Sequence, residues 1–192
     1  MDGFAHNWFL CGGWAVDAWL GRTTREHHDV DLAAFHDDQA AIFAQVATRK
    51  PIGHDDNVAG DTQEPWEGRW LDMPAHVHLR EADGLDWEFQ LCERNDPELV
   101  LRREPRTTFP LEKAVGMPGW GIPALSPAVI VYYKAIPPTW SNEPRDPPRP
   151  HDIHDFEVLL PLLRDADRPW LVESIGACEP EHPWLARLIG SG

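Results

Sequence analysis

The chain has 192 residues and a mass of 21.8 kDa, which corresponds to about one to one and a half domains. Its hydrophobic fraction of 42% and charged fraction of 26% are typical of globular proteins and exclude a wholly disordered chain. Seventeen basic and 32 acidic residues give a net charge of −15, which argues against a nucleic-acid backbone as the main partner. The charge suits a small or cationic substrate, although it is equally compatible with a role in solubility alone.

The cysteines and the apolar runs set further limits. Cys11, Cys92 and Cys178 are odd in number and lack C-x-x-C spacing, so we expect neither a disulfide framework nor a zinc ribbon. No apolar run approaches the roughly 20 residues of a membrane span. Residues 1–7 lack the basic region and the long apolar stretch of a secretory signal, so we expect a cytoplasmic protein without a membrane partner.

Up to about residue 110, the sequence predicts both strands and helices. Acidic and apolar residues that alternate indicate half-buried strands, while a glycine or an acidic residue marks a helix end or start. The predicted elements are a strand at 8–11, a helix at 14–20, a strand at 29–35, a helix from 37 or 38 to about 48, and strands at 76–80 and 85–91. Residues 81–84 predict a hairpin turn, and residues 52–68 indicate a loop or an irregular strand.

From about residue 126 the pattern becomes helical, because Ser126 and Pro127 are typical of a helix start. Six prolines among residues 137–150 predict a stiff loop. The helices expected after the first are at 151–163, with a break near Pro161, at 169–175 and at 183–189. We therefore expect an α+β fold, with a mixed β-sheet and flanking helices in residues 1–110 and a small, mostly helical region in residues 111–192 that completes the cleft.

Gly12 and Gly13 follow the first predicted strand and open the first predicted helix. Glycine lets the backbone approach a phosphate closely, and a helix N-terminus favours anions. A pair of glycines in this place is also common in plain turns, so this feature alone leaves both interpretations open.

Asp29 and Asp31 lie two residues apart in a predicted strand, so both side chains share one face. Neighbouring carboxylates repel each other unless a cation lies between them, and Mg²⁺ prefers carboxylate and phosphate oxygens. Two alternatives remain: a solvated strand surface, or a zinc site that combines these aspartates with His27 and His28.

The predicted strand at 85–91 alternates cleanly and places Asp86 and Glu88 on one face. If this strand lies in a metal-binding sheet, it adds a further carboxylate to Asp29 and Asp31 and completes a triad. An ordinary amphipathic strand gives the same pattern.

His151, Asp152, His154 and Asp155 form a second cluster of candidate metal ligands. On a helix, residues 151, 154 and 155 share a face, as in a conceivable His–Asp metallohydrolase site. That class of enzyme needs further clusters of His and Asp, and none is evident in the sequence. We therefore favour a capping and packing segment of the helical region.

In their order along the chain, these motifs resemble the nucleotidyltransferases of the polymerase-beta type. The run from Gly12 to Leu32, with Gly-Gly-Trp, Gly-Arg-x-Thr-Arg and His-x-Asp-x-Asp, is similar to aminoglycoside 2''-adenylyltransferases and lincosamide nucleotidyltransferases. The resemblance is strong over residues 8–35, moderate over residues 76–91 and loose in the helical half. Family members usually carry a helix before the Gly-Gly strand, and we expect that helix to be short or absent here, because eleven residues precede Gly12.

The resemblance implies a role for each residue of the motifs. Asp29 and Asp31 would hold Mg²⁺ on the nucleoside triphosphate, and Asp86 would bind a metal or take the proton of the acceptor hydroxyl. Glu88 would bind a substrate amine. The implied nucleotide-binding residues are Gly12, Gly13, Arg22, Arg25 and Lys134.

The reaction implied is the transfer of a nucleoside monophosphate, AMP from MgATP in the first instance, to a hydroxyl group, with release of pyrophosphate. Two Mg²⁺ ions about 3.5–4 Å apart would assist both oxygens of the displacement. The expected acceptor is a small, hydroxylated and cationic molecule such as an aminoglycoside-like antibiotic, since an acidic protein concentrates cations. The alternatives are a lincosamide, an endogenous metabolite, a protein or RNA end, and an inactive nucleotide-binding module. The sequence leaves the acceptor, the preferred nucleotide and the oligomeric state open.

Overall fold

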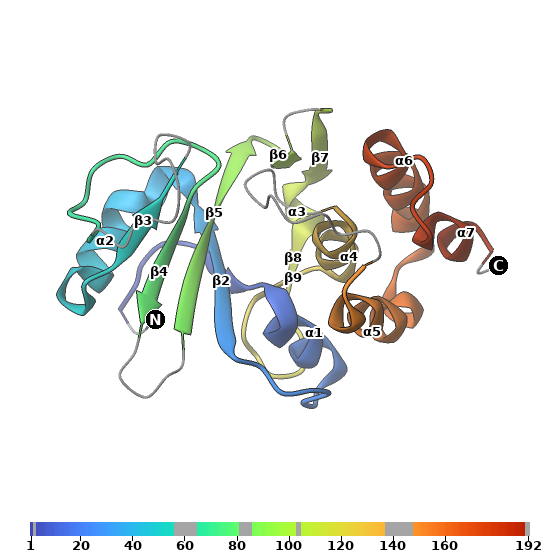
Figure 1. The fold of residues 1–192 in the computed structure, drawn as a ribbon, viewed down its shortest axis with the longest axis horizontal. Coiled ribbons are helices and arrows are strands. Elements are labelled where there is room, and N and C mark those ends of the chain that lie inside the picture. The colour runs from blue at the N-terminus through green and yellow to red at the C-terminus, as the bar shows by residue number, and fades with distance from the viewer. Residues whose placement is uncertain (2, 56–64, 81–85, 103–104, 137–147, 191–192) are drawn as a thin grey trace.

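The computed structural model describes the chain except for residues 2, 56–64, 81–85, 103–104, 137–147 and 191–192. A mixed β-sheet with flanking helices occupies one side of the molecule, and a group of helices formed by the C-terminal part of the chain occupies the other (Figure 1). This architecture confirms the predicted α+β fold.

Strands dominate the described residues up to position 125, and helices dominate those that follow. In chain order, the elements are β1 (Trp8–Leu10), α1 (Gly12–Leu20), β2 (Asp29–Phe35), α2 (Gln39–Val46), β3 (Ile52–His54), β4 (His76–Arg80), β5 (Asp86–Asn95), β6 (Glu98–Arg102), β7 (Thr107–Pro110), α3 (Leu111–Ala114), β8 (Val115–Gly116), β9 (Ala124–Leu125), α4 (Pro127–Ala135), α5 (Pro150–Leu159), α6 (Arg168–Cys178) and α7 (Trp184–Ile189).

The sheet has the order β3-β4-β5-β2-β1-β9-β8. Its centre is the parallel pair β2 and β5, with β4 antiparallel to β5 on one side and β1 antiparallel to β2 on the other. The last residues of β5 leave this sheet and pair with β6, which pairs in turn with β7. β2 and β5 are therefore flanked on both sides, and their register fixes the positions of the candidate site residues.

Most elements predicted from the sequence are confirmed, and the bounds of β2 and β4 agree with the prediction. The predicted break near Pro161 is present, since α5 ends at Leu159 and a 3-10 turn follows at Leu160–Leu162. The sequence did not predict β6 to β9. The hairpin turn at 81–84 and most of the proline-rich loop lie outside the described residues.

The division of the chain at residue 110 stays a prediction. Beyond that residue, β9 pairs in parallel with β1, and β8 pairs with β9, so the sheet includes short strands from both parts of the sequence. Before β1 the described residues, which omit residue 2, contain no helix.

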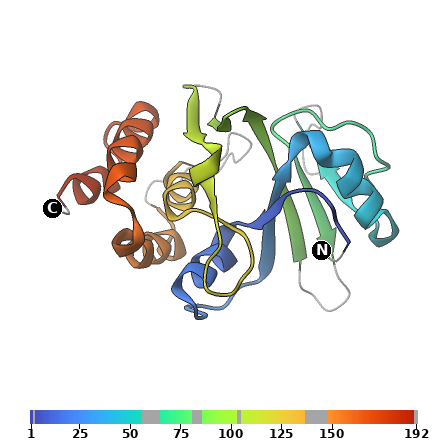
Figure 2. The same ribbon diagram turned by 180° about the vertical axis from the view of Figure 1, so that it is seen from behind.

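The core lies on both sides of β2, whose last four residues, Leu32–Phe35, are all buried. On one face α2 covers the sheet and buries Ile42 and Val46 (Figure 2). On the other face Tyr133 of α4 lies in hydrogen-bonding contact with Cys92 of β5. The C-terminal half of β2 is thus covered on both faces. In its N-terminal half, Asp31 lies next to Gly12 of α1 and within electrostatic reach of Lys134 of α4.

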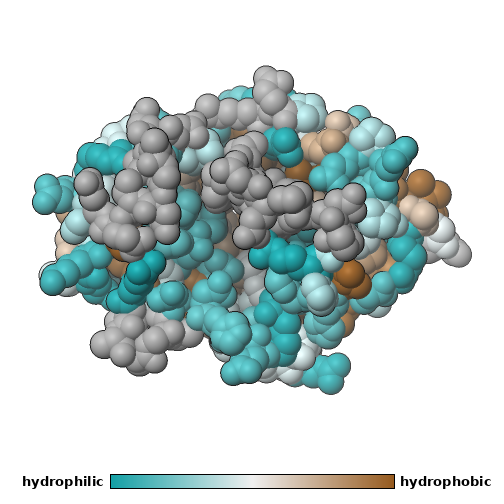
Figure 3. Space-filling view, viewed as in Figure 1, coloured by the Kyte–Doolittle hydropathy of each residue, from teal (hydrophilic) through white to brown (hydrophobic). Residues whose placement is uncertain are grey.

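Hydrophilic residues predominate among the coloured residues on the side shown in Figure 3, and hydrophobic residues appear there only in small, separate places. Among the described residues, no helix has both the length and the apolar character that a membrane span requires.

Candidate active site

Four carboxylates lie on one face of the sheet, at the N-terminal ends of β2 and β5. The parallel register sets Asp29 beside Asp86 and Asp31 beside Glu88. Neighbouring strands are about 4.8 Å apart and alternate residues share a face, so the four side chains form one group. Asp29 and Asp86 are exposed, whereas Asp31 and Glu88 are half-buried. The structure thus places the three carboxylates that were predicted as metal ligands on one face of two paired strands.

The environment of Asp31 disfavours the ionised form of its carboxyl group. Burial raises its pKa to about 7, and the nearby negative charges of Glu88 and Asp29 add to the shift, while Lys134 and His78 oppose it. A half-buried carboxylate next to two others fits a bound cation, because a cation removes the repulsion. Oxygen ligands of this kind suit Mg²⁺, which usually takes one or two carboxylates together with phosphate oxygens.

Gly12 begins α1 directly beside Asp31. Its φ is +57°, and a Cβ atom on it would lie only 1.9 Å from Oδ2 of Asp31. A Cβ atom on Gly13 would lie 2.3 Å from Nη2 of Arg25 and 2.5 Å from the His27 ring. The two glycines therefore let the first turn of α1, with its unpaired backbone N–H groups, approach the carboxylates closely.

A buried aspartate fixes the loop that leads into β2. Asp17 of α1 accepts hydrogen bonds from the backbone N–H and the hydroxyl of Thr24, at 3.0 and 2.6 Å. Nε2 of His27 lies 2.6 Å from the other oxygen of Asp17, and the His27 ring contacts the Trp14 ring in a tilted arrangement, with 4.6 Å between the ring centroids. His27 is thus bound to Asp17, and the one closely spaced group of potential metal ligands among the described residues contains neither His27 nor His28. Asp17 was not predicted from the sequence, although a lone acidic residue within an apolar helix was a usable signal.

Arg25 and Lys134, both predicted to bind the nucleotide, meet at Asp155 of α5. Nε and Nη2 of Arg25 donate to the two oxygens of Asp155 at 3.3 and 3.2 Å. Nζ of Lys134 lies 2.9 Å from Asp155 and 2.9 Å from Asp152. Burial alone would raise the pKa of Asp155, but its hydrogen bonds and ion pairs with Arg25 and Lys134 lower it. The buried carboxylates of Asp152 and Asp155 thus hold the side chains of Lys134 and Arg25.

Two further predicted residues occupy different settings. Arg22 is exposed just beyond the end of α1. Glu88 accepts a hydrogen bond from Gln90 at 2.6 Å, and its other oxygen lies 3.2 Å from Nε2 of His78. Burial opposes ionisation of Glu88, yet the hydrogen bond with His78 lowers its pKa. Glu88 is thus an ionised carboxylate that lies beside Asp31 in the acidic group and also contacts His76 and His78.

The contact between Gly12 and Asp31 can be tested with a matched pair of substitutions. Gly12→Ala and Gly21→Ala both place alanine at a positive φ, which costs about 1–2 kcal/mol. Only Gly12→Ala also collides with Asp31, since nothing lies within 4 Å of a Cβ on Gly21. We expect Gly12→Ala to lower the melting temperature further and to weaken metal-dependent nucleotide binding more than tenfold. Equal losses in both variants would contradict this prediction.

The raised pKa of Asp31 gives a prediction for stability. Between about pH 4 and pH 7 the folded protein holds a proton that the unfolded chain has lost, so stability falls as the pH rises through this window. In metal-free protein at pH 8, Asp31→Asn should raise the free energy of unfolding by about 1–3 kcal/mol. The gain should shrink as the pH falls toward 4. Urea unfolding at both pH values measures it, with Asp37→Asn as the exposed control.

The chain resembles known proteins both in sequence and in fold. The sequence model of the family described as aminoglycoside-2''-adenylyltransferase matches residues 1–99, whereas no curated protein gives a significant match. Among solved structures, the lincosamide antibiotic adenylyltransferase LnuA with bound lincomycin is 16% identical, with a TM-score of 0.54, over 82% of this chain and 87% of that chain.

Two structures of the antibiotic-resistance factor ANT(2'')-Ia also match, each at 14% identity. The solution structure gives a TM-score of 0.55 over 95% of this chain and 86% of that chain. The complex with adenylyl-2''-tobramycin gives a TM-score of 0.54 over 88% of this chain and 87% of that chain. At these identities the likeness concerns the fold, while the family model covers more than half of the sequence. The chain therefore belongs to the aminoglycoside-2''-adenylyltransferase family and is a nucleotidyltransferase.

Proposed function

We propose that the protein transfers AMP from MgATP to a hydroxyl group of an aminoglycoside-like antibiotic and releases pyrophosphate. The observation that carries the proposal is the alignment of Asp29 and Asp31 with Asp86 beside the Gly12 turn. A net charge of −15 supports a polycationic acceptor, because an acidic protein attracts cations. A cytoplasmic location stays a prediction.

In this proposal Asp29, Asp31 and Asp86 hold up to two Mg²⁺ ions. Bound there, Mg²⁺ would neutralise charge on the triphosphate and on the acceptor oxygen. The oxygen of the acceptor hydroxyl forms a bond to the α-phosphorus, and the bond from that phosphorus to the pyrophosphate oxygen breaks. Asp86, the exposed carboxylate beside Asp29, takes the hydroxyl proton.

The backbone at Gly12 and Gly13 and the side chains of Arg25 and Lys134 bind the phosphates in this proposal. The support is positional: Lys134 acts electrostatically on Asp31, and Arg25 contacts the Gly13 position. Arg22, exposed at the edge of the same loop, is the weakest member of this set. Glu88 contributes negative charge that attracts an amine of the acceptor.

The reaction can be tested by mass spectrometry. Purified protein, Mg²⁺ and each of the four nucleoside triphosphates are mixed with aminoglycosides or with lincosamides. We expect an aminoglycoside heavier by one nucleoside monophosphate, formed with ATP. Asp29→Asn and Asp86→Asn should lower kcat/KM at least 10²-fold, because a positioned carboxylate contributes about 10²–10⁴-fold.

The matched control is Asp165→Asn, which changes a fully exposed aspartate remote from the acidic group. It should react like the wild type. An adduct on lincosamides alone would replace the proposed acceptor. The absence of an adduct on every drug, with ATP still bound, would refute the antibiotic as acceptor.

Asp155→Asn tests the arrangement of the cations. The substitution removes the negative charge that binds both Arg25 and Lys134. We expect KM for ATP to rise about tenfold. The free energy of unfolding should fall by about 1–3 kcal/mol at pH 7, because two ion pairs are lost. The pKa of Asp155 is lowered in the folded protein, so this stabilisation is present above pH 4 and is lost at lower pH. A wild-type KM for ATP in the variant would show that Asp155 does not position these cations.

A further inference from the structure

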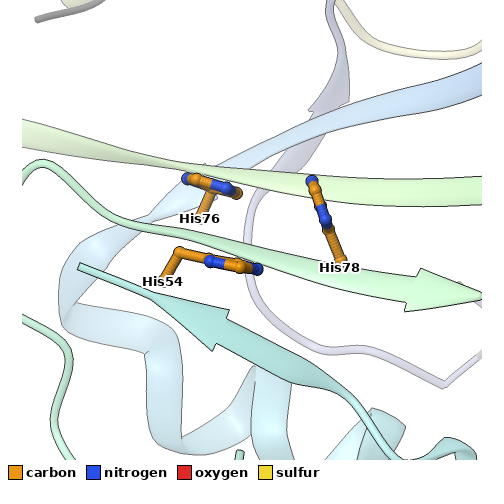
Figure 4. Close-up of side chains that lie close together, drawn as sticks. All are labelled: His54, His76 and His78. Carbon is orange, nitrogen blue, oxygen red and sulfur yellow. The ribbon is translucent and has the colours of Figure 1, made fainter. Parts of the chain in front are cut away.

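Three histidines gather beside the acidic group, on the same face of the sheet. His54 comes from β3, and His76 and His78 come from β4 (Figure 4). The antiparallel register sets His54 opposite His76, and His78 lies two residues further along β4. The rings of His54 and His76 stack at 4.6 Å, and the His78 ring lies 5.1 and 4.9 Å from them.

The nitrogen atoms of this triad are close enough to share one ion. One ring nitrogen from each histidine lies within 4.8 Å of the other two. Zn²⁺ with Zn–N bonds of 2.0–2.1 Å needs nitrogens about 3.4 Å apart, so small rotations of the rings suffice. All three side chains are half-buried, which limits their alternative rotamers without closing the site to an ion.

Glu88 adds negative charge at the edge of the triad. Its carboxylate oxygens lie 3.2 Å from Nε2 of His78 and 3.9 Å from Nε2 of His76. A carboxylate that accepts an N–H from a histidine fixes the ring and makes its other nitrogen a better ligand. Gln90 donates to Glu88 at 2.6 Å and holds the carboxylate in this position.

We propose that His54, His76 and His78 bind a divalent transition-metal cation of the zinc type, with Glu88 as the carboxylate that orients His78. Imidazole nitrogens favour Zn²⁺, Cu²⁺, Ni²⁺ and Fe²⁺ over Mg²⁺, which prefers oxygen. The site is therefore distinct in chemistry from the carboxylates of Asp29 and Asp31. It does not depend on the proposed transfer reaction, and a cation in it ties the short strand β3 to β4.

The test is a titration of chelator-treated protein, free of any affinity tag, with Zn²⁺ in excess Mg²⁺. Calorimetry should give one Zn²⁺ per chain, and Co²⁺ should give the visible absorption of a nitrogen-ligated site. His54→Gln and His76→Gln should each lower the affinity for Zn²⁺ at least tenfold. Zn²⁺ should raise the melting temperature of the wild type but not of these variants.

Two controls separate this site from other histidines and from the carboxylates. His6→Gln removes an exposed histidine that pairs with Asp38, and Asp29→Asn removes one carboxylate of the acidic group. Both should keep the wild-type affinity for Zn²⁺. Equal affinity in the wild type, His54→Gln and His76→Gln would overturn the proposal, as would a loss confined to Asp29→Asn. Melting of the metal-free variants verifies that each one folds.

Discussion

The register of β2 against β5 is the constraint on which the candidate site depends, because it sets Asp29 beside Asp86 and Asp31 beside Glu88. A slip of one residue would turn the carboxylates of the shifted strand toward the opposite face of the sheet. A slip would also move Leu32–Phe35, which are all buried, and so disturb the packing of the core. The apolar half of β2 therefore stabilises the arrangement that its acidic half destabilises through repulsion.

The two cations near the acidic group, Arg25 and Lys134, form ion pairs with aspartates of α5. If Lys134 were paired directly with Asp31, each would neutralise the other, and neither would be available to a ligand. Instead, Asp152 and Asp155 of α5 hold Lys134, and Asp155 also holds Arg25. The cations stay ordered, and the charge of Lys134 still favours the ionised form of Asp31. This division explains why the helical region contributes to the site although it is distant in sequence.

The sequence predicted the carboxylates, the glycines and most helices, because each depends on a local pattern. The alternation in β2 and the Gly12–Gly13 pair are visible within a few residues. The contact between Arg25 and Asp155 spans 130 positions and has no local signal. The triad containing His54 depends on the pairing of a three-residue strand, which the sequence alone left as loop or irregular strand. The two-residue strands β8 and β9 are too short to show any periodicity.

One face of the sheet thus presents two ligand chemistries side by side. The row that crosses β4, β5 and β2 runs from His78 through Glu88 to Asp31, so imidazole changes to carboxylate over three strands. Zn²⁺ binds most sites more tightly than Mg²⁺ does, and carboxylates alone discriminate poorly between them. Imidazoles beside the carboxylates offer Zn²⁺ a better set of ligands than Asp31 does. Glu88 links the two, because its charge raises the pKa of Asp31 and also pairs with His78. A cation bound at the histidines would offset the negative charge of Glu88, and the pKa of Asp31 would therefore fall.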